Sequence, residues 1–346
     1  MTSSLHSFGL GIATVNNINE IIEVYYPAPV ISPPKELSAI LSEILSYNAH
    51  ENAVIRLDQT SIEKFHDRVS RSDLSGIAQQ LEILATSRQP IIACCLSCDS
   101  TPSSVAEVFL KLHLLSHRFS LPNSLNLNGA FGILHNLAWT NKGAVELKDL
   151  AKKQLEYRCA GELLEVMSVD KFPKMANYIV PPGVRIAHTA RVRLGAYLGE
   201  GTTVMHEGFV NFNAGSAGAA MIEGRISASV MVGKGSDLGG GCSIMGTLSG
   251  GGTQVISVGE NSLIGANAGI GFPLGDRCIV EAGLYVTAGT KVNLLNLENK
   301  QIDSVKALEL ANKPDLLFRR NSLNGAVECR PNKKQIALNE DLHSND

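Results

Sequence analysis

The sequence predicts a mainly β protein, in which a parallel β-helix of hexapeptide repeats follows an α/β N-terminal domain and precedes a short C-terminal segment. Two observations carry this prediction. An aliphatic residue recurs at every sixth position along most of the second half, which is the signature of a β-helix. Of the 32 glycines, 24 lie between Pro182 and Val292, and such a density excludes long helices there.

The first half alternates strand-like and helix-like segments, which is typical of a small α/β domain. We place this domain at residues 1–120. Its longest helix is expected over 102–119, where Ser104 and Glu107 have the spacing of a capping box. The other expected elements are strands at 21–30, 52–57 and 89–96 and helices at 35–47 and 75–87.

Residues 121–178 are expected to hold a helical segment and a linker. The helix runs over 147–161 and ends at Gly161, a residue that commonly terminates helices. The stretch "DKFPKMANYIVPPG" (170–183) has the character of the linker. The β-helix is then expected at 179–293 and the C-terminal segment at 294–346.

The hexad pattern assigns inward and outward positions. Each six residues form one short strand and one turn, the aliphatic residue points inward, and three hexads close one triangular coil. The aliphatic positions are Ile186, Val192, Leu198, Val204, Val210, Ile222, Val232, Leu238, Ile244, Val258, Ile264, Ile270, Leu274, Val280, Val286 and Val292. Small residues four positions later are expected to fill the interior beside them: Ala196, Thr202, Ala214, Ser236, Cys242, Ser262 and Ala268.

The stretch "MIEGRIS" (221–227) places a carboxylate and a guanidinium among small residues. Ile222 is the inward aliphatic residue of its hexad and Ile226 is expected to be its second inward residue, so Glu223 and Arg225 should point outward from a flat wall. The neighbouring stretches "GSDLGGGCS" and "GTLSGGGT" are almost bare of side chains, which lets another chain or an extended ligand approach closely. From these residues alone, a solvated face and a site both remain open.

Composition limits the class of partner. With 30 basic and 33 acidic residues and a net charge of −3, neither nucleic acid nor a membrane surface is expected to bind. We expect a cytoplasmic protein, because no apolar run approaches the ~20 residues that span a bilayer and the first residues do not resemble a signal peptide. The pairs Cys95–Cys98 and His113–His117 are read as a buried strand and a helix surface instead of metal sites, since no further ligands accompany them.

Several stretches resemble one family closely. They are "VRLGAYLGEGTTVMHEGFVNFNAG", "MIEGRIS", "GKGSDLGGGCSIMGTLSGGG", "LIGANAGIGFPLGDRCIVEAGLYVTAGTKV" and "LLFRRNSLNGAVE". Together they are similar to the longer-chain group of 2,3,4,5-tetrahydropyridine-2,6-dicarboxylate N-succinyltransferases, most densely from Lys171 to Glu328. The resemblance implies a left-handed β-helix and a homotrimer. It also implies transfer of succinyl from succinyl-CoA to ring-opened tetrahydrodipicolinate, giving N-succinyl-2-amino-6-oxopimelate and CoA in lysine and diaminopimelate biosynthesis.

The resemblance also assigns roles to residues. It implies that Glu223 is catalytic and forms an acyl anhydride, and that Glu207 binds a divalent cation, Mg²⁺ or Ca²⁺, near the trimer axis. The preceding coil, "AHTAR", has no acidic residue to support such a site, so we expect weak binding there and no tightly bound cofactor. The contacts implied for succinyl-CoA, the co-substrate, are Arg225, Gly240, Ser243, Ala266, Glu281, Ala282, Gly289, Lys306, Arg319, Arg320, Asn321 and Ser322.

Elementary chemistry leaves two roles open for Glu223. A carboxylate can attack a thioester as a nucleophile, or it can accept a proton from an ammonium group as a general base. A nearby arginine favours the ionised carboxylate and so works against the second role. Arg225 equally suits a substrate carboxylate, which it could bind in a bidentate pair.

Three alternatives follow from the fold. Another hexapeptide-repeat, CoA-dependent acyltransferase with a different donor or acceptor would commonly carry a catalytic histidine on a coil, where the sequence offers His188 and His206. A γ-carbonic-anhydrase type of hydrase needs an H-x-x-x-x-H pair, which the coils lack. A scaffold without catalysis would give no reason for Glu223 and Arg225 on an almost bare wall.

Overall fold

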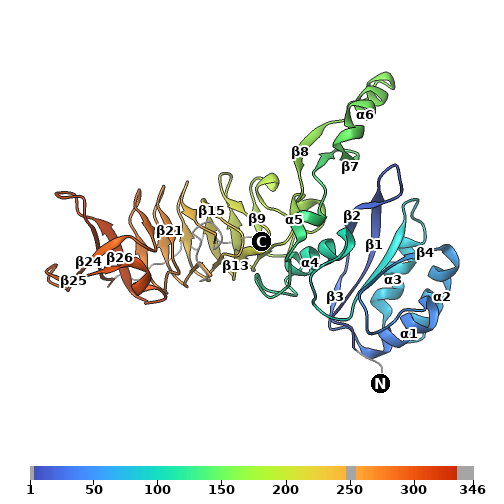
Figure 1. Cartoon of the computed structure of the whole chain (residues 1–346), viewed down its shortest axis with the longest axis horizontal. Coiled ribbons are helices and arrows are strands. Elements are labelled where there is room, and N and C mark those ends of the chain that lie inside the picture. Colours follow the sequence, from blue (N-terminus) through green and yellow to red (C-terminus); the bar gives the residue numbers. More distant parts are fainter. Residues whose placement is uncertain (1–3, 247–254, 333–346) are drawn as a thin grey trace. The chain divides into compact units, whose positions relative to one another are not determined.

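The computed structural model describes residues 4–246 and 255–332. Within them the chain forms two compact units. The first contains the residues up to Leu114 and those from Leu125 to Pro173, and the second contains Leu115–Ser124 and the residues from Lys174 onward. Figure 1 colours the chain from blue to red along the sequence. Among the described residues, no helix is long and apolar enough to cross a membrane.

The first unit is built on a five-stranded sheet in the order β2-β1-β5-β4, with β3 also paired to β1, and every pairing is antiparallel. The expected alternation of strands and helices is confirmed. The elements are β1 Ser7–Val15, β2 Ile21–Tyr25, β3 Val30–Ile31, α1 Lys35–Leu45, β4 Ala53–Leu57, α2 Gln59–Val69, α3 Ser75–Leu84, β5 Ile91–Leu96 and α4 Val105–Ser116. Figure 1 shows α1, α2 and α3 on one side of this sheet and α4 on the other.

Strand β1 explains these two layers. Phe8 and Leu10 belong to the buried cluster formed with α1, α2 and α3. Gly9 faces the opposite side, where an added Cβ would lie 2.7 Å from the Tyr26 ring and 2.8 Å from Leu110 of α4. The alternation of large residues with glycine therefore lets helices pack closely on both faces of the sheet.

The sequence prediction missed α2 and β1. Helix α2 begins at an N-cap aspartate, Asp58, whose carboxylate accepts a hydrogen bond of 2.7 Å from the backbone N–H of Ser61. That N-cap residue and the following pattern were a usable signal. The capping interaction predicted for α4 is confirmed, since the Glu107 N–H lies 3.3 Å from Ser104 Oγ and the Glu107 carboxylate bonds to Ser103 and Ser104.

The segment expected to be a helix and a linker contains more structure than that. The helix is confirmed as α6, Leu147–Cys159. A three-stranded antiparallel sheet in the order β7-β6-β8 was missed, and the Trp139 indole donates to the Asp170 carbonyl within it at 2.8 Å. The remaining elements here are α5 Ala130–Ile133, β6 Leu137–Thr140, β7 Gly143–Glu146, β8 Val166–Asp170 and the 3₁₀ helix η1 Met175–Asn177.

The second unit is a parallel β-helix with three walls, which confirms the predicted fold class. Its strands are short because each coil turns three times. The first wall contains β9 Arg185–Ile186, β11 Thr202–Val204, β14 Ala220–Ile222, β17 Asp237–Leu238, β20 Leu263–Ile264 and β22 Ile279–Val280. The second contains β12 Phe209–Val210, β15 Arg225–Ile226, β18 Ser243–Ile244, β21 Gly269–Gly271 and β23 Tyr285–Thr287, and the third contains β10 Ala196–Leu198, β13 Ala214–Ser216, β16 Met231–Val232 and β19 Ser257–Val258.

The predicted interior of the β-helix is confirmed. Every predicted aliphatic position except the half-buried Ile186 is buried, and so is every small residue predicted four positions later. Because the coils stack with parallel strands in register, each interior residue lies above its counterpart in the coil before, as Ile244 does above Ile226. The hexad rule therefore identifies the core from sequence.

Two further segments belong to this unit. The segment Leu115–Ser124 lies along β10 and the loops beside the third wall, where Ser116 Oγ donates to the Ala196 carbonyl at 3.1 Å and Asn123 Nδ2 to the Ser229 carbonyl at 2.9 Å. After the last coil, the chain forms two hairpins, and β26 pairs with β22 to extend the first wall. These elements are β24 Lys291–Leu295, β25 Gln301–Lys306, η4 Ala307–Leu310, β26 Leu316–Arg320 and β27 Val327–Pro331.

Candidate active site

The candidate site lies where the chain passes from the first wall to the second, a position that we call the first corner of a coil. At four coils the first corner contains four residues, namely 205–208, 239–242, 265–268 and 281–284. The last residue of each is buried, whereas the third is exposed in all four corners. These regular corners form one edge of the β-helix.

The first corner at Glu223 is shorter. Only Glu223 and Gly224 lie between β14 and β15, so this corner has two residues fewer than the corners around it. The expectation that Ile226 is the second inward residue of its hexad is wrong: Ile226 pairs with Val210 and Ile244 and takes the aliphatic position of the second wall. The separation of four residues between Ile222 and Ile226 is ambiguous. It fits two inward residues of one hexad, and it equally fits the aliphatic residues of two neighbouring walls joined by a shortened corner. Glu223 therefore lies on a corner, and Arg225 begins the wall beyond it.

The three glycines of "LGGGC" have different structural explanations. An added Cβ at Gly239 would lie 2.7 Å from the backbone nitrogen of Ala266, so the stacking of coils requires glycine there. Gly241 has a φ of +70°, which favours glycine. Gly240 has neither constraint, and the nearest atom to an added Cβ is Oε2 of Glu223 at 3.5 Å. Gly240 thus leaves open space beside the Glu223 carboxylate.

Gly224 is explained by packing. An added Cβ would lie 2.3 Å from Sγ of Cys242, the buried residue of the next corner. Burial raises the pKa of the Cys242 thiol to about 12, so this sulfur is a neutral packing group at physiological pH. Glu223 and Arg225 are therefore separated by a residue that only glycine can supply.

The side chains of Glu223 and Arg225 are unpartnered within the described residues: neither makes a hydrogen bond or an ion pair there. Their backbones are fixed, because the Glu223 N–H donates to the Leu238 carbonyl at 2.9 Å and the Arg225 N–H donates to the Cys242 carbonyl at 2.8 Å. Glu223 is half-buried and Arg225 is exposed. A fixed backbone with two opposite charges left unpaired is an arrangement suited to binding a ligand.

The structure brings one group of the predicted CoA contacts together. Gly240, Ala266 and Ala282 lie on successive first corners, which are joined by backbone bonds from Asn267 N to the Gly240 carbonyl (2.9 Å) and from Gly283 N to the Ala266 carbonyl (2.8 Å). Arg225 and Ser243 are direct neighbours on the second wall. Tyr285 lies on the same row, and its ring covers Gly269.

A second group of predicted contacts lies in the C-terminal hairpins. Arg319 is already paired, since its Nε and Nη2 each lie 2.9 Å from Oε2 of the buried Glu328. Asn321 donates to the other oxygen of Glu328 at 2.7 Å. The Glu281 carboxylate accepts a bond of 2.7 Å from the Arg320 N–H. Arg319 and Asn321 therefore shape the turn, and sequence reasoning missed the glutamate that holds both.

The remaining predicted contacts are exposed. Ser322 and the Arg320 side chain lie at the tip of the β26–β27 hairpin, where Arg320 Nη1 is 3.2 Å from the Gly325 carbonyl. Gly289 lies beside η4, because the Leu308 N–H donates to the Ala288 carbonyl at 3.1 Å. Lys306 is opposite Lys291 in the β24–β25 pair, so two lysines occur together there.

Glu207, predicted as a cation ligand, occupies a regular corner. One of its oxygens lies 3.1 Å from Arg191 Nη2 and the other 3.1 Å from His206 Nδ1. Within the described part of this chain, no three His, Cys, Asp or Glu side chains gather as a metal site. A divalent cation bound to Glu207 would compete with the Arg191 guanidinium.

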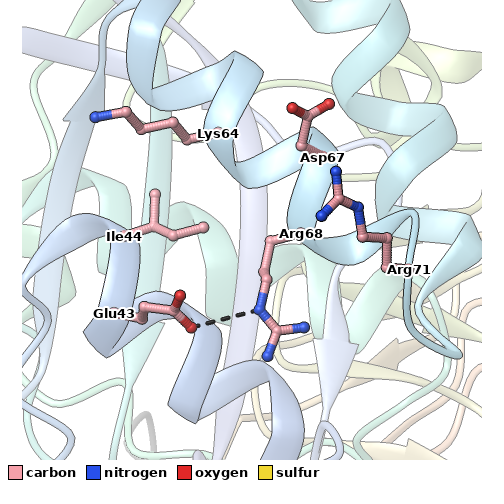
Figure 2. Close-up of a pocket in the computed structure, with 6 residues that line it drawn as sticks. All are labelled: Glu43, Ile44, Lys64, Asp67, Arg68 and Arg71. Atoms are coloured by element: carbon pink, nitrogen blue, oxygen red, sulfur yellow. Dashed lines mark hydrogen bonds and ion pairs between the residues drawn. The ribbon is translucent and has the colours of Figure 1, made fainter.

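A depression of about 350 Å³ in the first unit is lined mainly by charged side chains (Figure 2). Arg68 reaches Glu43 at 3.4 Å across it, and both side chains are exposed. None of the predicted site residues lies there. Surface pairs of this type contribute little to stability and do not identify a ligand. In the stretch "GTLSGGGT" (246–253), residues 247–253 lie outside the described residues.

Comparison with known proteins places the chain in a class and then in a family. A model of the hexapeptide repeat of succinyl-transferase matches residues 255–288, and a model of the middle region of tetrahydrodipicolinate N-succinyltransferase matches residues 134–174. The fold and site thus define a hexapeptide-repeat acyltransferase. The chain belongs to the tetrahydrodipicolinate N-succinyltransferase family, as the relatives described next show.

The 2,3,4,5-tetrahydropyridine-2,6-dicarboxylate N-succinyltransferase of Pseudomonas aeruginosa is 60% identical over 344 residues, which is 99% of each chain. The enzyme of the same name from Vibrio cholerae is 54% identical over 341 residues, 98% of each chain. A crystal structure from Campylobacter jejuni, described as a 2,3,4,5-tetrahydropyridine-2-carboxylate N-succinyltransferase, superposes with a TM-score of 0.89 at 35% identity. That comparison covers 96% of this chain and 93% of the other. The predicted family and fold are confirmed.

Proposed function

We propose that this protein transfers the succinyl group of succinyl-CoA to the amino group of ring-opened tetrahydrodipicolinate, with Glu223 as the catalytic residue. The observation that carries the proposal is the unpartnered Glu223 carboxylate, fixed by its backbone at the one shortened first corner among those described and open toward Gly240. Full-length identity of 60% to an enzyme named for this reaction supports the substrate class.

The reaction combines a ring opening with an acyl transfer, and the acyl transfer breaks one bond and forms one. Water adds to the C=N bond of the cyclic dicarboxylate, and the ring opens to an amine and a ketone. The amine then becomes acylated: its C–N bond replaces the C–S bond of the thioester, CoA leaves as a thiolate, and the amine loses a proton. Glu223 can take that proton, or it can first accept the succinyl group itself as an anhydride that the amine then opens.

Arg225 is suited to hold one of the carboxylates in these substrates. Its guanidinium is exposed, makes no bond within the described chain, and begins the wall directly after Glu223. Both the succinyl group and the acceptor carry carboxylates, which pair with arginine through two parallel hydrogen bonds. Binding at Arg225 would orient the substrate beside Glu223 instead of changing the chemistry at the reacting carbon.

The CoA portion is proposed to run along the first corners toward the C-terminal hairpins. Gly240, Ala266 and Ala282 offer backbone with little side chain, and Arg320 and Lys306 offer positive charge for phosphates. Because Arg319 is neutralised by Glu328, we assign the phosphate contact on β26 to Arg320. The chain is proposed to act as a cytoplasmic homotrimer with sites between neighbouring β-helices, since an exposed edge cannot enclose a substrate alone.

The experiment is an assay of free thiol released from succinyl-CoA in the presence of tetrahydrodipicolinate, with acetyl-CoA as a comparison donor. Rapid release with succinyl-CoA that depends on the acceptor is expected. Equal rates with acetyl-CoA would point to the alternative, an acyltransferase with a different donor. To test shared sites, Glu223→Gln chains are mixed with chains that carry an inactivating substitution on the other side of the interface between neighbouring β-helices. Recovery of activity is expected, and no recovery would place each site within one chain.

A further inference from the structure

The shortened corner interrupts the edge of the β-helix. At the regular corners on either side, the residues that protrude are the two in the middle, such as His206 and Glu207, both exposed. At Glu223 these two positions are missing, while the flanking positions keep their bonds: Glu223 N donates to the Leu238 carbonyl at 2.9 Å, and Phe209 N donates to the Gly224 carbonyl at 3.0 Å. We call the resulting gap the notch, with Glu223 and Gly224 as its floor and corners 205–208 and 239–242 as its sides.

The size of the notch suits an extended chain. Neighbouring coils are about 4.8 Å apart, so the two flanking corners are about 10 Å apart. Carbon atoms in contact lie ~3.5–4 Å from each other, so an extended chain of methylene and amide groups fits between the sides. At the side of the notch, an added Cβ on Gly240 would lie 3.5 Å from Glu223 Oε2, whereas on the floor Gly224 is buried and an added Cβ there would point at Cys242 in the interior. The gap is thus kept clear by the missing side chain of Gly240.

The notch also leaves backbone groups available. In regular corners the third residue donates its N–H to the second residue of the coil before, as Asn267 does to Gly240 at 2.9 Å. At the notch there is no third residue to donate to His206, and no donor among the described residues bonds to the His206 carbonyl. On the other side, the Gly241 N–H reaches only the Glu223 carbonyl, at 3.4 Å. A ligand with amide groups would find an acceptor here.

We propose that the notch seats the thioester of the donor and the amide group next to it, where the path of the donor along the first corners ends, and that the loss of two corner residues positions Glu223 against the thioester carbon. The inference rests on the proposed function, because it takes Glu223 as the catalytic residue. It adds no chemical step. It assigns a role to the length of the corner, and it makes Gly240 the residue that sets the width of the notch.

The test restores the missing length. Inserting Ala-Asn between Glu223 and Gly224 copies Ala266 and Asn267, and the inserted asparagine can adopt the positive φ that Asn267 has (56°). The thermal midpoint should change by a few degrees at most, and binding of CoA should weaken no more than tenfold. We expect kcat with succinyl-CoA to fall at least 100-fold. The control is the same insertion between Glu298 and Asn299 in the β24–β25 turn, which should keep its turnover.

A folded insertion variant that keeps more than a tenth of wild-type turnover would overturn the proposal. If the insertion does not fold, the series Gly240→Ala and Gly240→Val decides, since each narrows the notch without backbone strain; turnover should fall with side-chain size, and unchanged turnover would overturn the proposal equally. Glu223→Gln in the same assay distinguishes a failure of the proposed function from a failure of the notch proposal. An active Glu223→Gln protein refutes the proposed function, whereas an inactive one beside an active insertion variant refutes only the notch.

Discussion

Two consecutive first corners each carry a glutamate, and the two carboxylates have different surroundings. Glu207, in a corner of four residues, contacts Arg191 with one carboxylate oxygen and His206 with the other. Glu223, in a corner of two residues, has no such partner among the described residues, and its neighbour Arg225 has none either. The comparison teaches that a charge fixed by its own chain contributes to structure, whereas an unpaired charge on a rigid backbone is available to a substrate.

The largest effect is expected from a substitution of Glu223, the glutamate without a partner among the described residues. We predict that Glu223→Gln lowers turnover at least 1000-fold, about 4 kcal/mol of transition-state stabilisation, because the amide can neither attack the thioester nor accept a proton. The fold, the oligomeric state and CoA binding should not change, since the side chain lies outside the core. Glu260→Gln, an exposed corner glutamate, is the matched control. Retention of more than a tenth of wild-type turnover would contradict the catalytic assignment.

The nature of the catalysis has its own measurement. If Glu223 is a nucleophile, rapidly quenched enzyme should carry a succinyl group on the peptide containing residue 223, detectable by mass spectrometry. If no adduct forms under conditions that trap other acyl-enzymes, the general-base role is favoured.

The second prediction concerns Arg225. Removing its guanidinium should raise KM for one of the two substrates and lower kcat/KM by about 30- to 100-fold, since a hydrogen-bonded charge pair contributes about 2 kcal/mol. Steady-state kinetics of Arg225→Ala with each substrate varied in turn identifies which carboxylate it holds. The control is Arg277→Ala, because Arg277 is an exposed arginine paired with Asp315 at 2.6 Å. If kcat/KM for both substrates were unchanged, Arg225 would be a solvated residue.

A third prediction separates glycines that serve the fold from one that serves the site. At Gly208, an added Cβ would lie 2.2 Å from the Ile222 carbonyl oxygen, so Gly208→Ala should cost about 2 kcal/mol of unfolding free energy. Gly240→Ala should leave that free energy within about 0.5 kcal/mol, because nothing in the backbone opposes it. Urea unfolding of both variants is the measurement. Equal losses of stability would mean that Gly240 is also a packing position.

Histidine 117 gives a smaller and pH-dependent effect. Burial lowers its pKa to about 4, against about 6.5 in an unfolded chain, so the folded state prefers the neutral ring. The stability contributed by this difference is complete above pH 6.5 and is lost as the pH falls from 6.5 toward 4. Between pH 7 and 5, His117→Gln should lose about 1 kcal/mol less unfolding free energy than wild type, after allowance for partial exposure. His50→Gln, at an exposed position, should behave like wild type.

The smallest effect is expected from metal removal. Because Arg191 and His206 already hold Glu207, any Mg²⁺ or Ca²⁺ shared by three copies on a trimer axis should bind weakly, and chelation should leave turnover unchanged. Elemental analysis of chelator-treated protein and its turnover are the measurements. One tightly held ion per trimer, or turnover abolished by chelator, would show that the pairing with Arg191 gives way to a cation.

The β-helix could be predicted from sequence because every coil repeats the same environment, so that the position of Val232 in the repeat was enough to assign it to the core. The same counting failed at Ile226. The corner before it is two residues shorter than the others, and the resulting separation of four residues from Ile222 is also the separation expected within one hexad. In the first unit, β6 and β7 were missed because each strand has only four residues, too few for a clear alternating pattern, and β8 was missed because it pairs with β6 from a distant part of the sequence. The pairing of Arg319 with Glu328 depends on the register of the β26–β27 hairpin, which the sequence pattern does not determine.

The hairpin that closes the last coil has a consequence for solubility. A stack of parallel strands presents the same row of unpaired N–H and C=O groups at its end as it uses inside, and so it could continue into a second molecule. Strand β26 occupies that row on β22, and β27 returns antiparallel to β26, which breaks the parallel pattern. The hairpin therefore caps the end of the β-helix, and a protein that lost it should polymerise end to end into fibres.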